Sequence, residues 1–217
     1  MKHLFVFLLM LLSIPAIAQW ENAKIDSVVS FQLPSGYERT KSDSENNFLA
    51  RTAFGTILVF KAKDDTIVTP DIEKERHLRN YYDDYIKRVQ SSASEGKITD
   101  EKDTLLGELK VKDFTLQIDS GSGVQYRKFR ILHANNATYT FEFLYQDIHK
   151  EYADEECMKF FNSIKINETV SRADQFNAPD GDKSGQRTAV LIGAGIGILI
   201  VALVVFFILK RRRKTIS

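Results

Sequence analysis

Short runs of apolar residues, separated by polar residues and turn formers, fill the chain from Trp20 to Ile166. The run from Val28 to Leu33 alternates apolar and polar residues, as a half-buried β-strand does, and Pro34-Ser35-Gly36 ends it. The next stretch, from Asn47 to Lys61, is interrupted at Gly55. It predicts either two strands or one long bent strand.

A helical period follows Thr69. Thr69 can cap a helix, Pro70 suits its first turn, and Asp71 suits the positive end of the helix dipole. The helix is expected to end between Ser91 and Gly96. Apolar residues recur on one of its faces at Leu78, Tyr82, Tyr85, Ile86 and Val89.

The period returns to two after Gly96. Leu109 and Val111 share one phase, and the apolar residues from Phe114 to Ile118 share the other. This change of phase predicts a bulge or tight turn at Lys112-Asp113. The sequence Asp119-Ser120-Gly121-Ser122-Gly123 then predicts a hairpin loop.

Two further strands and a helix complete this pattern. One strand is expected from Val124 to His133, with another slip of phase near Arg127-Lys128. The clearest strand follows Asn135-Asn136, where Tyr139, Phe141, Phe143 and Tyr145 alternate with Thr138, Thr140 and Glu142. The final helix has an apolar face of Ala153, Cys157, Phe160, Phe161 and Ile164.

This order of elements predicts one α+β domain over residues 19–166, in which two helices pack on a mostly antiparallel sheet. Hairpin-length connections favour antiparallel pairing, and amphipathic helices need a sheet face to cover.

Three motifs resemble those of the PsbP/Mog1-like family. Phe31-Gln32-Leu33-Pro34-Ser35-Gly36-Tyr37 is similar to the family's opening, an F-x-x-P-x-G-aromatic sequence. The strand from Ala137 to Phe143 and the helix end from Phe160 to Lys165 resemble its closing motifs. The resemblance covers about Ile25 to Ile166. It implies an α/β/α sandwich that serves as a non-enzymatic binding or assembly module, and it transfers no ligand residues.

The first 18 residues are typical of a secretory signal peptide. Lys2 and His3 precede the apolar run from Leu4 to Ile14, and Ala16-Ile17-Ala18 is a small-x-small cleavage sequence before Gln19. The apolar run is too short to span a bilayer comfortably. An uncleaved anchor is the alternative interpretation.

A second apolar run, residues 188–209, has 22 residues and no charge. At about 1.5 Å per residue it would be roughly 33 Å long, which matches a bilayer core. The five cations from Lys210 to Lys214 predict that the basic tail, residues 210–217, stays in the cytoplasm. Both apolar runs therefore predict a single-pass cell-membrane protein with an extracytoplasmic domain.

Residues 167–187, between domain and span, are rich in turn formers and predict a flexible linker. Within the span, Gly193 and Gly197 form a GxxxG pair, so self-association through this helix is one interpretation.

Charge is distributed unevenly along the 217 residues. The whole chain has a formal net charge of +1, but residues 19–187 contain 24 Lys and Arg against 29 Asp and Glu, a net charge of −5. An acidic domain argues against nucleic acid as a partner.

The single cysteine, Cys157, excludes a disulfide within the chain, and its place on an apolar helix face predicts a buried thiol.

No motif predicts a catalytic residue, a metal ligand or a cofactor-binding residue. The four histidines lack ligand-spaced partners, and neither a phosphate loop nor CxxC is present. Aromatic residues between helix and sheet could line a ligand groove, namely Tyr81, Tyr82, Tyr85, Phe48, Phe54 and Phe60.

The sequence favours a membrane-tethered module that binds or assembles other envelope proteins. The alternative is an envelope hydrolase that uses carboxylates such as Asp83 and Asp84.

Overall fold

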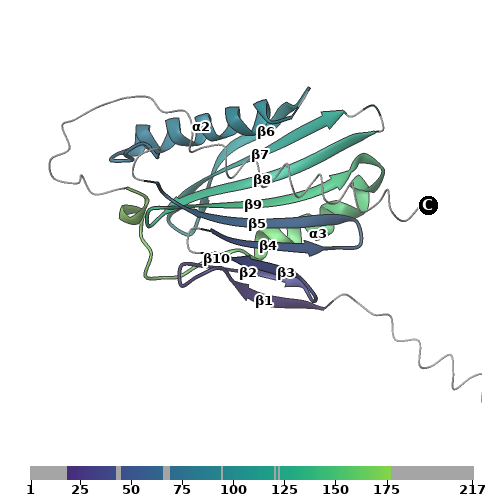
Figure 1. Cartoon of the computed structure of the whole chain (residues 1–217), viewed down its shortest axis with the longest axis horizontal. Helices are drawn as coiled ribbons and strands as arrows, with labels where there is room; N and C mark the ends of the chain where they lie inside the picture. The colour runs from purple at the N-terminus through teal and green to yellow at the C-terminus, as the bar shows by residue number, and fades with distance from the viewer. Residues whose placement is uncertain are drawn as a thin grey trace, which may run out of the picture.

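The computed structural model describes residues 19–42, 45–65, 69–93, 95–119, 121 and 123–176. These residues form a seven-stranded antiparallel sheet and a three-stranded antiparallel sheet (Figure 1). In spatial order, the large sheet contains β3 (Glu38–Lys41), β4 (Glu45–Arg51), β5 (Gly55–Lys63), β9 (Ala137–Gln146), β8 (Val124–Ala134), β7 (Leu109–Asp119) and β6 (Lys97–Leu106). The small sheet contains β1 (Trp20–Lys24), β2 (Val29–Pro34) and β10 (Lys165–Ile166).

Two α-helices cover opposite faces of the large sheet. Helix α2 (Glu75–Ser91) lies on one face, and helix α3 (Lys150–Ser163) lies on the other, beside the small sheet. The short helices η1 (Asp147–His149) and η2 (Arg172–Gln175) come before and after α3. The predicted α+β class, with mostly antiparallel strands and two helices, is confirmed. The layer that contains α3 is not purely helical, because the small sheet completes it.

Aromatic rings from four elements form the core on the α3 side. Phe31 of β2 makes edge-on contacts with Phe48 of β4, Phe141 of β9 and Phe160 of α3, at centroid distances of 5.3, 6.1 and 6.4 Å. The predicted apolar face of β9 is confirmed, because Tyr139, Phe141 and Phe143 are all 0% exposed.

A second core lies under α2. Phe114 of β7 and Phe129 of β8 stack there at 4.6 Å, and the helix contributes its apolar face. The buried residues of that face are Leu78, Tyr81, Tyr82, Ile86 and Val89. The sheet is therefore covered on both sides, and its central strand β9 has no solvated face.

The second face of β9 is polar and still buried. Tyr81 and Tyr85 of α2 reach down to it, and their hydroxyls lie 2.6 Å from Thr138 Oγ1 and 2.7 Å from Thr140 Oγ1. Burial raises the pKa of Tyr81 to about 12, so its phenol stays neutral and available for hydrogen bonding. These bonds satisfy polar groups that would otherwise destabilise the domain.

A buried ion pair continues this polar layer. Arg127 of β8 donates two hydrogen bonds to the Glu142 carboxylate of β9, one of them 3.0 Å between Nη2 and Oε2. Both side chains are buried, at 5% and 0% exposure. Strand β8 pairs with β9 without a break, so the slip of phase that was predicted near Arg127 does not occur. The apolar alternation is interrupted there because a charged residue, Arg127, faces inward.

The start of α2 differs from the sequence prediction. The helix begins at Glu75 rather than near Pro70, because Ile72 turns into the core and is fully buried. The Thr69 hydroxyl accepts a hydrogen bond from the Asp65 amide at 3.1 Å, so it closes a turn instead of capping the helix.

The predicted bulge at Lys112-Asp113 is wrong. Strand β7 pairs with β8 continuously from Lys112 to Asp119, and the irregularity lies on β6 between Thr99 and Lys102. The phase of β7 changes because its first residues are buried on the α3 side, whereas Phe114 and Leu116 are buried under α2.

The domain extends beyond Ile166, whereas the sequence pattern predicts a flexible linker over residues 167–187. The part from 167 to 176 folds back on the sheet, and Gln175 is fully buried. Of the other expected segments, the signal peptide 1–18, the linker part 177–187, the span 188–209 and the tail 210–217 lie outside the described residues, as do Gly193 and Gly197. No helix within the described ranges has the length and hydrophobicity to cross a membrane.

We predict that Arg127→Met lowers the free energy of unfolding by about 3–5 kcal/mol, because it leaves the Glu142 carboxylate buried without its partner. The double variant Arg127→Met/Glu142→Leu should recover most of that loss. Urea denaturation of the three proteins measures both effects. An equal loss in the double variant would show that packing, rather than the unpaired charge, causes the destabilisation.

We expect Asp26 to cause part of the loss of stability of the fold at acid pH. Burial alone would raise the pKa of its carboxyl group, but hydrogen bonds from Lys61, Tyr139 and two backbone amides hold that pKa below the ordinary value of 3.8. Its stabilising effect is therefore present above about pH 4 and is lost as the pH falls through the lowered pKa. Asp26→Asn should be less stable than the natural chain at pH 7. The difference between them should shrink in denaturation curves at lower pH, and a constant difference would contradict this assignment.

Candidate functional site: a recess between α2 and the β6–β7 hairpin

An open recess of about 270 Å³ lies between the first turns of α2 and the hairpin of β6 and β7. Its apolar wall consists of Leu78, Tyr82 and Val111, and Leu105 stands at its side with 62% of its surface exposed. Its polar lining residues are Glu75, Arg79, Asp103, Thr104 and Lys110.

A two-residue turn brings this hairpin to the recess. Leu106 pairs with Leu109, and Gly107 between them has a φ of +63°, which a residue with a side chain rarely adopts. Leu109 is fully buried and fixes the hairpin to the core. Strand alternation then leaves Leu105 on the outside, at the recess.

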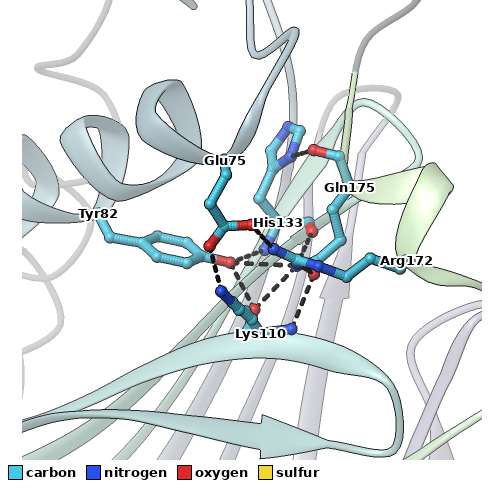
Figure 2. A network of polar contacts seen from close by, with 6 residues as sticks. All are labelled: Glu75, Tyr82, Lys110, His133, Arg172 and Gln175. Carbon is cyan, nitrogen blue, oxygen red and sulfur yellow. Dashed lines mark hydrogen bonds and ion pairs between the residues drawn. The ribbon is translucent and has the colours of Figure 1, made fainter.

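Three charged side chains meet at one end of the recess. The Glu75 carboxylate accepts hydrogen bonds from Lys110 through one oxygen and from Arg172 through the other (Figure 2). The hydrogen bond from Lys110 is the largest of the effects that lower the pKa of Glu75. The acid therefore remains a carboxylate, and each of its oxygens is bonded to one cation.

Gln175 fastens the C-terminal segment to the sheet beside this ion pair. Its side-chain oxygen accepts the Lys110 amide at 2.8 Å, and its side-chain nitrogen donates to the Lys110 carbonyl at 2.8 Å and to the His133 carbonyl at 3.0 Å. The amide group thus pairs with both backbone groups of one β7 residue, as a neighbouring strand would (Figure 2).

His133 and Tyr82 complete the network. His133 Nδ1 lies 3.1 Å from the Gln175 carbonyl, and Nε2 lies 2.9 Å from Asp64 Oδ2. The Tyr82 hydroxyl donates to the Lys110 carbonyl at 3.0 Å and accepts the His133 amide at 2.9 Å. Burial is the largest effect that raises the pKa of Tyr82 above its ordinary value. Every ring nitrogen of His133 is occupied, so this residue holds the segment in place.

The polar groups of the network are engaged with one another. The acid, the cations, the histidine and the phenol of the network are bonded to one another, and the recess adds exposed apolar surface beside them. A general base needs a free acceptor aimed at its substrate, and a nucleophile needs an adjacent base. Neither arrangement occurs among the recess residues named above.

The carboxylates of the hydrolase alternative do not converge on a cleft. Asp83 lies 3.6 Å from Lys112, whose ammonium also pairs with Glu101 and Asp103. Asp84 points to solvent and pairs with Lys87 on its own helix. Within the described ranges, no group of three or more His, Cys, Asp or Glu residues could hold a metal ion.

The aromatic groove that the sequence suggested is divided by the sheet. Phe48 belongs to the core on the α3 side, whereas Tyr81 and Tyr82 belong to the core under α2. Cys157 is buried as predicted, and burial raises the pKa of its thiol to about 12. Such a thiol is almost entirely protonated at neutral pH and is a poor nucleophile.

Sequence reasoning missed the central residues of this site. Arg172 and Gln175 lay in the supposed linker, and Glu75, Lys110 and Leu105 carried no motif. One signal was present: Ser171 and Asp174 have the spacing of a capping box, and they form one at the start of η2. That motif marks a helix start and therefore argues against a coil.

Comparison with solved structures identifies the fold. It is similar to that of the cyanobacterial PsbP protein (CyanoP) from Synechocystis sp. PCC 6803, with a TM-score of 0.50 and 8% identity over 71% of this chain and 96% of that chain. LpqN, involved in cell envelope biogenesis of Mycobacterium tuberculosis, matches with a TM-score of 0.42 and 10% identity over 69% of this chain and 91% of its own. The Saccharomyces cerevisiae Ran-binding protein Mog1p matches with a TM-score of 0.42 and 6% identity over 74% and 100%.

The PsbP/Mog1-like fold expected from the three sequence motifs is thereby confirmed. No family model and no curated protein matches the sequence. At sequence identities of 6–10%, the structural similarity establishes the fold alone and says nothing of ligands.

We predict that Gln175→Ala destabilises the domain by about 2 kcal/mol, because it removes a buried side chain and leaves the Lys110 amide without its acceptor in a partly buried position. The matched variant Arg172→Ala should cost less than about 1 kcal/mol, since it removes a partly exposed ion pair. Thermal and urea denaturation of both variants test this. If the two losses were equal, the buried amide would not be the main fastening of the segment.

Proposed function

We propose that this protein is a membrane-tethered, extracytoplasmic binding or assembly module, and that it holds a segment of another envelope protein in the recess beside α2. The observation that carries this proposal is an exposed leucine, Leu105, beside a recess whose acid, Glu75, is already bonded to Lys110 and Arg172. Such a surface favours association without providing reactive groups.

The size of the recess favours a side chain as its occupant. Pockets that enclose a small-molecule ligand typically have volumes of about 300–1,000 Å³. At about 270 Å³ this recess is smaller and open on one side, so it suits one or two apolar side chains of a partner polypeptide. The rim of Arg79, Lys110 and Asp103 can then make polar contacts around them.

The sequences of the two chain ends support the proposed membrane tether. An export signal before Gln19 and an apolar run followed by five cations support a domain held outside the membrane. Tethering raises the local concentration of the domain at any partner in the same bilayer without a new contact. A weak contact at the recess is then sufficient for stable assembly.

Affinity capture from membranes tests both parts of the proposal. The full chain should retain a partner that Leu105→Asp loses, because the substitution replaces an apolar contact with a carboxylate that must be desolvated when the partner's apolar side chain covers it. Met158→Asp is the matched control, since Met158 lies on helix α3 and is exposed to a similar extent. A chain that ends at Phe176 should remain folded and capture the same partner at least about tenfold more weakly.

Two outcomes would contradict the proposal. Capture that survives Leu105→Asp would show that the recess is not the binding surface. Equal capture by the full chain and by the chain that ends at Phe176 would show that the membrane has no part in recognition. Circular dichroism and melting curves of each variant ensure that a loss of capture is not a loss of folding.

A further inference from the structure

A second exposed apolar surface, the aromatic patch, consists of Phe54, Ile148 and Tyr152. Ile148 and Tyr152 are 78% and 59% exposed and lie one helical turn apart, where η1 runs into α3. Within the described ranges, four large apolar side chains are highly exposed, and three of them belong to this segment, with Met158 further along α3. The fourth is Leu105 at the recess. Exposed apolar side chains that gather in this way mark interaction sites.

The patch is held rigidly by the fold. The rings of Phe54 and Tyr152 stack at 5.1 Å with an angle of 26° between their planes. The Glu156 carboxylate of α3 accepts the backbone amides of Ala53 and Phe54, both at 3.1 Å. This pair of bonds ties the β4–β5 turn to the helix, so a partner would meet a preformed surface and would not need to order it.

Gly55 lets this turn approach the sheet closely. A Cβ atom at Gly55 would lie 2.6 Å from the Phe143 ring and 2.8 Å from the Leu144 carbonyl oxygen. Only glycine fits there, and Phe54 is left partly buried against the α3-side core, with its ring stacked on Tyr152.

Acidic side chains surround the patch. Asp147, Glu151 and Glu155 are exposed and lie on the same turns as Ile148 and Tyr152. Within the described residues, Glu151 and Glu155 form no ion pair, whereas Asp154 is neutralised by Lys128 at 2.7 Å. Among the cations of this region, Lys150 lies over the Tyr126 ring at 5.3 Å and Lys159 lies over the Trp20 ring at 4.6 Å. The rim is therefore negative, and it repels both an anionic lipid surface and a second identical patch.

The patch and the recess lie at opposite ends of the sheet. Tyr145, near the end of β9, pairs with Gly55 beside the patch, whereas Ala137 at its start pairs with Ala134, next to the segment that carries Gln175. A strand of ten residues is roughly 30 Å long, so one partner cannot fill both sites with a single side chain.

We propose that the aromatic patch is a separate binding surface for a polypeptide segment that presents apolar side chains flanked by lysine or arginine. Apolar side chains of the segment cover Phe54, Ile148 and Tyr152, and its cations face Glu151 and Glu155. Aromatic residues at the centre of an interface typically carry the affinity, and charges at its rim select the partner. Together with the recess, this surface lets the domain hold two partners at once.

Two short synthetic peptides test the patch on the full chain, held in phosphatidylcholine nanodiscs. They share a Phe-Leu-Phe centre, which lysines flank in one peptide and glutamates in the other. Fluorescence anisotropy should show that the lysine peptide binds at least about tenfold more tightly. Ile148→Ser/Tyr152→Ser should abolish this binding, and Glu151→Lys/Glu155→Lys should reverse the preference. Met158→Ser and Leu105→Asp are the controls, and neither should change it.

Three results would overturn this assignment. The first is equal binding of the two peptides, or a preference that the charge reversal leaves unchanged. The second is association of the nanodisc-held chain with phosphatidylglycerol vesicles that Ile148→Ser/Tyr152→Ser abolishes, which would assign the patch to lipid. The third is self-association that the same serine variant abolishes, which would assign it to a second copy. Because Leu105→Asp leaves the patch intact, failure of the patch and failure of the recess are distinguishable.

Discussion

The fold depends on a central strand that must bury both of its faces. On the α3 side β9 presents Tyr139, Phe141 and Phe143, and on the α2 side it presents Thr138, Thr140 and Glu142. An apolar face needs only complementary shape, but a buried polar face needs a partner for each donor and acceptor. Tyrosines of α2 and Arg127 of β8 supply those partners. This requirement fixes where α2 lies on the sheet.

The placement of α2 in turn creates the recess. Tyr82, one residue after Tyr81, directs its hydroxyl to the Lys110 carbonyl at the end of the sheet where β7 begins. Glu75 then lies within reach of Lys110, and Arg172 approaches the same carboxylate from the C-terminal segment. The ion pairs at this site are consequences of where the helix lies, and they leave both oxygens of the Glu75 carboxylate bonded.

Faces that are buried by apolar residues were easier to predict from the sequence than faces that are buried although they are polar. Strict alternation identified the aromatic face of β9, because an apolar residue at every second position has no other common explanation. The same alternation placed Glu142 on the polar face of β9 but did not predict its burial, since a single sequence does not show which strand or helix covers that face. The role of Gln175 was not predicted for a similar reason. Its partners are backbone groups of Lys110 and His133, and every residue type has such groups, so the sequence does not identify them.

The C-terminal segment gives the proposed tether a fixed starting point. A linker that began at Asn167 would leave from the side of the small sheet, where β10 ends. Because Gln175 is fastened to β7, the described chain instead ends at Phe176, beside the recess. If the span anchors the protein as we propose, the recess is the binding surface nearer the attachment point, and the aromatic patch lies roughly a strand length further away. A partner at the recess and a partner at the patch would then differ in their distance from the bilayer, which is a geometry suited to joining two neighbours.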